Sequence, residues 1–342
     1  MFRFQKNRSG SGVPVMRRIA ELWGAISRIL SPAKWTPIGV DIDNDVLTAV
    51  QFERNRKGAI LIAAGSKNRP ENIEFGSSSW QRWAIEAIRE LAANGRFHGR
   101  DVIAAMPANE VFIDHIKMPK IEKDKQEDAI FSKIKQKLPF EADDAMIKYL
   151  AAEDDNVMVV AVERKKIDRH LAIYEEAGLQ IKSITVWPTA LANSYARFFG
   201  RRKSDVEAIV MLLNIDRNYT NVVICRHKNP LFACSIPVGT KQLRTASNGA
   251  ADEMISKLVL ELTACKRRFG STYKEAHVER LIFLSSHTID IGICTTIAKQ
   301  MDMPAQMGDC LAAVEEANID GLVIDRRGCE VNWATAFGLS LS

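Results

Sequence analysis

Two segments of the sequence, about 170 residues apart, share one pattern, and this internal repeat constrains the fold more than any other feature. The first segment, IGVDIDNDVLTAV at residues 38–50, consists of an apolar run, a polar turn and a second apolar run. The second, LLNIDRNYTNVVI at residues 212–224, has the same order when Asp41 is aligned with Asn214. Each segment continues through a charged hairpin tip into a third apolar run. The repeat therefore predicts two copies of a three-stranded meander.

Strand-like apolar runs alternate with segments of helical periodicity along the rest of the chain. This alternation predicts an α/β protein built of two layered halves. The charged stretch FGRRKSD at 199–205 marks the expected boundary between them. We expect a basic arm over 1–36, a first half over 37–205 with an insertion over about 106–178, and a second half over 206–342 with a small subdomain over about 246–275.

The net charge of +5 is concentrated at the N-terminus. Residues 1–36 carry seven Lys/Arg and one acid, whereas the remaining 40 basic and 41 acidic residues nearly balance. The folded body therefore has no charge excess for a nucleic acid, and we predict no nucleic-acid partner. Apolar residues between 15 and 30 recur with helical spacing and predict an amphipathic helix. We expect this arm to contact an anionic membrane surface, with packing against protein as the alternative; the residues concerned are Arg17, Arg18, Trp23 and Arg28.

Three smaller observations limit the expected cellular location of the chain and its chemistry. Its six cysteines form no C-x-x-C pair, which predicts reduced thiols in a cytosolic protein. No apolar run is long enough to span a membrane as a helix. His170 lies beside Arg169 and Lys166 in a helical segment, which predicts a solvated face.

Over about residues 37–342 the sequence resembles the type IV pilus assembly PilM family, which is related to FtsA. Four runs carry the resemblance: IKQKLPFEADDAMIKYLAAE, the EAGL segment, SIPVGTKQL and the C-terminal NWATAFGLSLS. The resemblance implies an actin-like (ribonuclease H-like, duplicated) α/β fold. In that fold two halves surround a central cleft, and the two repeated turns grip the phosphates of ATP. It also implies a small inserted subdomain in the first half.

The resemblance also indicates which residues would line the nucleotide cleft: Asp41, Asp43, Asn44, Asn214, Asp216, Thr220, Gly239, Ser285 and Ser286. Several depart from the family pattern. Asp43 and Asp216 replace glycines, Asn214 replaces an aspartate, and the two serines replace a glycine pair. Asp41, which agrees with the pattern, is the expected Mg²⁺ ligand.

Glycine allows a backbone N–H to approach phosphate closely, and an added carboxylate repels it. We therefore predict a degenerate nucleotide site, no cofactor and no enzymatic activity, with ATP and Mg²⁺ binding as the alternative.

For function, the resemblance implies a cytoplasmic scaffold, peripheral on the inner face of the bacterial inner membrane. Its expected partners are the N-terminal tail of a PilN-like bitopic membrane protein and the pilus motor or platform proteins. The tail is expected between the first-half sheet and the insertion, and the alternative is that the residues concerned are plain core. They are Met118, Pro119, Leu138, Pro139, Phe140 and Tyr149.

Other functions stay open at this point. One is an ATP-binding, FtsA-like polymerising switch that uses the matching Asp41, Thr220 and Gly239. Another is an actin-fold small-molecule kinase. A third is a platform protein of a type II secretion system, which shares this architecture.

Overall fold

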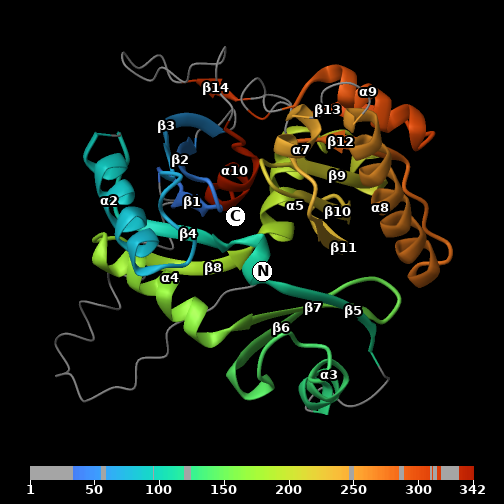
Figure 1. Ribbon diagram of the computed structural model, residues 1–342, viewed down its shortest axis with the longest axis horizontal. Coiled ribbons are helices and arrows are strands. Elements are labelled where there is room, and N and C mark those ends of the chain that lie inside the picture. Colours follow the sequence, from blue (N-terminus) through green and yellow to red (C-terminus); the bar gives the residue numbers. More distant parts are fainter. Residues whose placement is uncertain are drawn as a thin grey trace.

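The computed structural model describes most of the chain beyond the N-terminal arm (Figure 1). The described residues are 34–54, 59–94, 96–118, 125–245, 250–284, 289–308, 310, 314–316 and 331–342. The arm residues Arg17, Arg18, Trp23 and Arg28 lie outside them. No helix in these ranges is long and apolar enough to cross a membrane.

The first half is built on a six-stranded sheet in the order β14-β3-β2-β1-β4-β8. Strands β1, β2 and β3 form the predicted antiparallel meander, whereas β4 and β8 continue the sheet in parallel from β1. Strand β14 comes from the far end of the chain and pairs in parallel with β3. The bounds are β1 Ile38–Ile42, β2 Val46–Arg54, β3 Ala59–Asn68, β4 Asp101–Met106, β8 Gln180–Val186 and β14 Glu315–Glu316.

The second half repeats this plan in a five-stranded sheet with the order β11-β10-β9-β12-β13. The registers agree as well, because Ile42 pairs with Leu47 across the first turn and Ile215 pairs with Thr220 across the second. The predicted internal repeat is thereby confirmed. The bounds are β9 Ile209–Ile215, β10 Thr220–Arg226, β11 Asn229–Ile236, β12 Arg280–Phe283 and β13 Ala305–Met307.

Helices cover both sheets. Helices α2 (Ser78–Asn94) and α4 (Arg164–Glu176) pack on one face of the first sheet. The apolar residues of α2 that the sequence places on one helical face, Trp80, Ala84 and Ile88, are all buried there. Further helices are α5 Trp187–Phe198, α6 Lys203–Glu207, α7 Thr240–Thr245, α8 Ala250–Thr272, α9 Ile291–Gln300 and α10 Ala334–Ser340, with short 3₁₀ turns at Ala108–Glu110 and Ala142–Asp144.

Helices α5 and α10 lie between the two sheets and join them in one core. Phe52 of the first sheet, Leu212 of the second and Phe337 of α10 belong to the same buried cluster. The two helices pack so closely that a Cβ on Gly338 would lie 1.8 Å from the carbonyl oxygen of Ala190. The two halves are therefore joined by a common hydrophobic core as well as by a linker.

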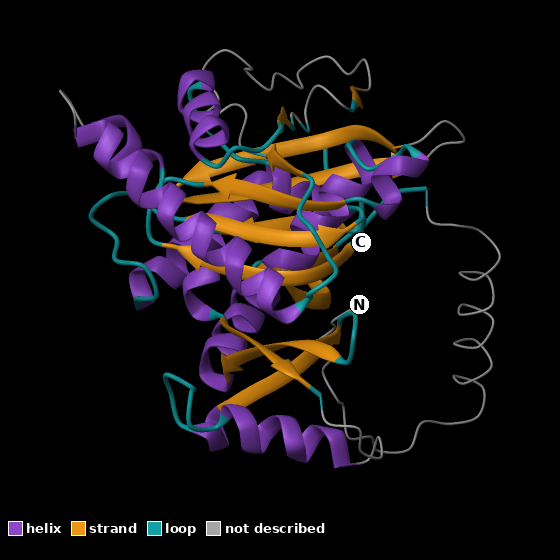
Figure 2. Cartoon of the chain, turned by 90° about the vertical axis from the view of Figure 1, so that its right-hand side faces the viewer, coloured by secondary structure: helices purple, strands orange, loops and turns teal. Residues whose placement is uncertain are grey.

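A separate three-stranded sheet projects from the first half (Figure 2). Its order is β5-β7-β6, with α3 (Gln126–Ile134) packed on it. Helix α4 follows β7 but packs against α2, so the projecting unit is shorter than the insertion expected over 106–178. The bounds are β5 Phe112–Lys117, β6 Ala145–Ala151 and β7 Asn156–Glu163.

The expectation of a solvated His170 is wrong. Its side chain is 1% exposed, and its Nε2 atom lies 2.9 Å from a carboxylate oxygen of Glu110. Arg169 forms an ion pair with the same carboxylate. Arg169 and His170 therefore both contact a buried carboxylate that lies about 60 positions away in the sequence.

Candidate functional site

The two repeated turns have the same backbone geometry. In the first, the N–H of Asp43 donates to the carbonyl of Val46 at 2.9 Å. In the second, the N–H of Asp216 donates to the carbonyl of Tyr219 at 2.8 Å. The duplicated strands thus place two four-residue turns, 43–46 and 216–219, at corresponding ends of the two sheets.

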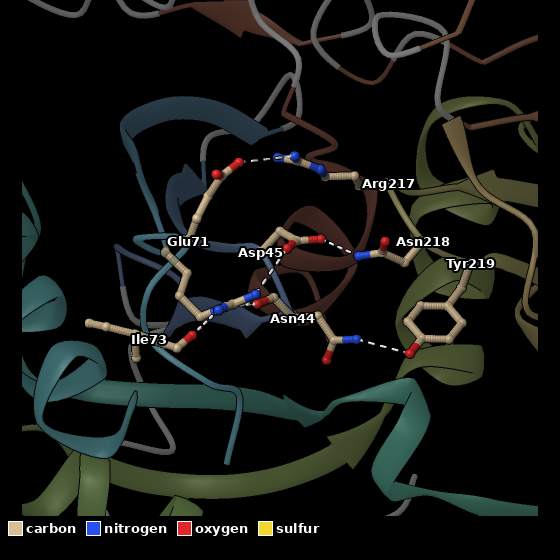
Figure 3. A network of polar contacts seen from close by, with 8 residues as sticks. Asn44, Asp45, Glu71, Ile73, Arg217, Asn218 and Tyr219 are labelled. Atoms are coloured by element: carbon tan, nitrogen blue, oxygen red, sulfur yellow. Dashed lines mark hydrogen bonds and ion pairs between the residues drawn. The ribbon is translucent and has the colours of Figure 1, made fainter. Parts of the chain in front are cut away.

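Three side-chain contacts join the second turn to the first half, and two of them reach the first turn (Figure 3). We call this set of contacts the turn junction; it consists of Arg217 with Glu71, Asn218 with Asp45, and Tyr219 with Asn44. The amide of Asn44 donates to the Tyr219 hydroxyl at 3.1 Å, and the amide of Asn218 donates to the Asp45 carboxylate. Arg217 and Glu71 lie 3.6 Å apart at the surface. Three consecutive residues of the second turn therefore each contact the first half.

Arg69, the residue that follows β3, supports the first turn. Its backbone N–H donates to the Asp45 carbonyl at 2.8 Å, and its guanidinium lies 3.2 Å from the Asp45 carboxylate. The same guanidinium donates to the carbonyl groups of Asn44 and Ile73. The Arg69 side chain thus pairs with the charge of Asp45 and also hydrogen-bonds the backbone of this turn.

Amide side chains support the second turn. The Asp216 carboxylate accepts hydrogen bonds from Asn214 at 2.7 Å, Asn332 at 2.8 Å and Asn221 at 3.3 Å. Asn332 precedes α10, so the C-terminal segment contributes directly to this turn. The Asp216 carboxylate therefore has three amide donors from within the protein.

Gly239 and Thr220 complete the second turn. A Cβ on Gly239 would lie 2.4 Å from the Arg217 carbonyl oxygen, so only glycine allows the chain after β11 to pass this close. The Thr220 hydroxyl donates to the Val238 carbonyl at 2.7 Å. Both residues thus serve the packing of the turn.

Carboxyl groups crowd this region, and burial and their mutual charge raise their pKa values. Burial, followed by the charge of Asp43, raises the pKa of Asp41 to about 7, although a hydrogen bond with Thr335 opposes the shift. Burial also raises the pKa of Asp43 to about 6. Burial and the charge of Asp43 hold the pKa of Asp216 well above its ordinary value. Added negative charge is therefore unfavourable here.

Two further observations bear on ligands. Among the residues described, no group of three His, Cys, Asp or Glu side chains is arranged to hold a metal ion. Three buried oxygens near the turns have no hydrogen-bond partner within the described part of the chain: Asn44 Oδ1, Thr48 Oγ1 and Asn221 Oδ1. Because buried polar atoms are normally hydrogen-bonded, these oxygens are acceptors available to a water molecule or to a small ligand that donates a hydrogen bond.

The predicted partner-binding residues fall on and around the projecting sheet. Met118 is buried against Ile130 and Ile134 of α3, as expected for core. Leu138 and Tyr149 are partly exposed on the edge of the same cluster. Pro139 is exposed and Phe140 is partly exposed, whereas Pro119 lies outside the described residues.

Sequence reasoning found some of the site and missed the rest. The two turns and Gly239 lie where they were predicted, whereas Ser285 and Ser286 fall outside the described residues. The contacts of Asn218, Tyr219, Arg69 and Asn332 were not anticipated. The only available signal was the excess of amide and hydroxyl side chains in RNYT and the asparagine that stands two positions before the last helix.

Comparison with known proteins identifies relatives. The family described as type IV pilus assembly protein PilM matches residues 39–248. A solved PilM–PilN type IV pilus biogenesis complex is similar at 18% identity, covering 90% of this chain and 98% of that chain, with a TM-score of 0.71. The ethanolamine utilization protein EutJ from Carboxydothermus hydrogenoformans is similar at 12% identity, covering 91% and 90%, with a TM-score of 0.51. Comparison with curated protein sequences gives no match. The predicted family resemblance and actin-like fold are confirmed.

Proposed function

We propose that this chain, which belongs to the PilM family of type IV pilus assembly proteins, is a scaffold that works by binding other proteins and does not turn over ATP. The observation that carries the proposal is the turn junction. Side chains of the two turns contact one another where the family resemblance would place phosphates. A scaffold held in one arrangement by its own contacts needs no nucleotide to set that arrangement.

The residues of the two turns fit a Mg²⁺-bound triphosphate poorly. The carboxyl groups of Asp43 and Asp216 stand in place of the glycines that would let backbone N–H groups reach phosphate. The amide donors around Asp216 are already used by that carboxylate. Like charges at close range cost several kcal/mol in a medium of low dielectric constant, about 4 kcal/mol at 4 Å for an effective value of 20.

We infer that the partner is the N-terminal tail of a PilN-like membrane protein, because a structural relative was solved as a PilM–PilN complex. The projecting sheet suits such a tail, since β6 is one of its two edge strands and can accept an added strand. Leu138, Phe140 and Tyr149 offer partly exposed apolar surface beside this strand. The scaffold would then lie on the inner face of the inner membrane beside pilus motor or platform proteins, with its basic arm on anionic lipid.

Calorimetric titration of the PilN-like tail peptide into the full chain tests the partner. We expect saturable binding that Tyr149→Ala and Leu138→Asp each weaken at least tenfold. The matched control is Leu260→Asp on α8, a residue that is 71% exposed on the second half. Absence of binding, or equal loss with the control, would reject this site.

Titration with Mg²⁺-ATP tests the nucleotide part of the proposal. A ligand at 100 times its Kd stabilises a protein by about 2.7 kcal/mol, which a melting curve shows clearly. We expect neither heat of binding nor a change in melting temperature. Either response at micromolar ATP would contradict the proposal.

A nucleotide-binding switch is the second candidate, and one observation favours it. The unpaired oxygens of Asn44, Thr48 and Asn221 lie at the turns and lack donors within the described structure. A bound ligand carrying hydroxyl or amino groups would satisfy them. ATP binding that Asn44→Ala abolishes would make this candidate the leading one.

A further inference from the structure

Two cysteines lie in contact at some distance from the turn junction. Cys234 belongs to β11 and Cys265 to α8, and their Sγ atoms are 2.9 Å apart although the residues are 31 positions apart in sequence. Both are free thiols. The close approach of their sulfur atoms means that little movement is needed to join them.

The surroundings give a small oxidant a route to this pair. Cys234 is partly exposed on the edge strand of the second sheet, whereas Cys265 is 5% exposed beneath it. Arg268 follows Cys265 by one helical turn, and its guanidinium lies 5.5 Å from the centre of the Phe232 ring. A hydrogen bond with Cys234 lowers the pKa of Cys265, burial opposes this shift, and the charge of Arg268 adds to it. Cys265 is thus the more readily ionised sulfur.

We propose that Cys234 and Cys265 are an oxidation site, at which an oxidant of the peroxide class joins β11 to α8 by an intramolecular disulfide. In the first step the Cys265 thiolate attacks one peroxide oxygen, the O–O bond breaks, and the departing hydroxide takes a proton from solvent. In the second step the Cys234 sulfur attacks the resulting sulfenic sulfur and the S–O bond breaks. The released hydroxide takes the Cys234 proton and leaves as water. Two thiols are oxidised and one peroxide is reduced to two waters.

The disulfide would act on a strand that also contacts the projecting sheet. The N–H of Ala233 donates to Nε2 of His115 at 3.1 Å, and the Phe232 ring stacks on the His115 ring with centroids 4.3 Å apart. His115 belongs to β5, so residues 232–234 contact β5 and α8 together. Oxidation would therefore fix α8 to the same strand that positions the projecting sheet.

The test treats the full-length reduced protein with hydrogen peroxide and then alkylates the remaining thiols. Of the six cysteines, we expect two to lose reactivity. Peptide mapping is expected to find one link, between residues 234 and 265. The melting temperature should rise by roughly 5 °C, since the link closes a loop of intermediate length, and a dithiol reductant should reverse the rise.

Variants separate this pair from the other thiols. Cys234→Ala and Cys265→Ala should each abolish both the link and the rise in melting temperature. Cys294→Ala, at a buried cysteine on α9, should retain both. Peptide mapping of the chain without substitutions needs no variant, so the test remains decisive even if one variant folds poorly. Retention of all six thiols, a link elsewhere, cross-linked dimers or only sulfinic acid would each overturn the proposal.

Discussion

The turns at 43–46 and 216–219 have the same backbone geometry, but different residues stabilise them. Arg69 holds the first through its guanidinium, whereas Gly239 and the amide of Asn332 hold the second. The repeat has thus kept the hydrogen bond that defines each turn while the surrounding residues diverged. The first turn should depend on a charged side chain and the second on close backbone packing, and substitutions can test this difference.

Gly239→Ala should give the largest effect. Its new Cβ would meet backbone oxygens at 2.4 and 2.5 Å, and backbone atoms cannot move aside as a flexible side chain does. We expect a loss of about 3 kcal/mol in the free energy of unfolding, measured by urea denaturation. Gly270→Ala in α8, where nothing lies within 4 Å of the new Cβ, is the control and should be neutral or slightly stabilising. Equal effects of the two changes would remove the role given to Gly239.

Arg69→Ala should follow, with a loss of about 2 kcal/mol, because charge-assisted hydrogen bonds to Asn44, Asp45 and Ile73 are lost together. Arg69→Lys keeps the charge but lacks the forked donor, so it should recover only part of the stability. Complete recovery with lysine would mean that charge alone supports the first turn.

The contact between β5 and β11 offers a contrast, because it depends on pH. Burial, with a smaller contribution from Arg268, lowers the pKa of His115 to about 4, although Asp114 opposes the shift. The unfolded chain binds a proton below about pH 6.5 and the folded chain only below about pH 4, so stability should fall between these values as pH decreases. His115→Gln should flatten this part of the profile of unfolding midpoint against pH. An unchanged profile would show that His115 titrates freely.

Tyr219→Phe should cost about 1 kcal/mol, because the amide of Asn44, which is 9% exposed, loses its acceptor. A double-mutant cycle with Asn44→Ala isolates the interaction across the turn junction. Strictly additive losses would indicate that the two side chains do not interact in solution.

Arg217→Ala should have the smallest effect, below about 0.5 kcal/mol. Its partner Glu71 is 92% exposed and 3.6 Å away, so solvent and salt screen the pair. A loss above 1 kcal/mol that high salt abolishes would show that the surface contact contributes more than its exposure suggests.

The sequence predicted those features that depend on local order. The apolar runs predicted the strands and the aligned turns predicted the duplication, because both features are encoded by residues that are close in sequence. The partners of Asn218 and Tyr219 could not be predicted in this way, since they depend on how the two halves meet. The error at His170 has the same cause: helical periodicity carries no information on Glu110, which is distant in sequence.

The placement of α10 has a consequence for the order in which the chain can fold. Ala336 packs against Gly39 so closely that a Cβ on Gly39 would lie 2.2 Å from the Ala336 carbonyl oxygen. During synthesis, β1 leaves the ribosome nearly 300 residues before this helix. The first half must therefore wait with part of one face of its sheet uncovered, and we expect it to need protection by a chaperone until α10 has been synthesised.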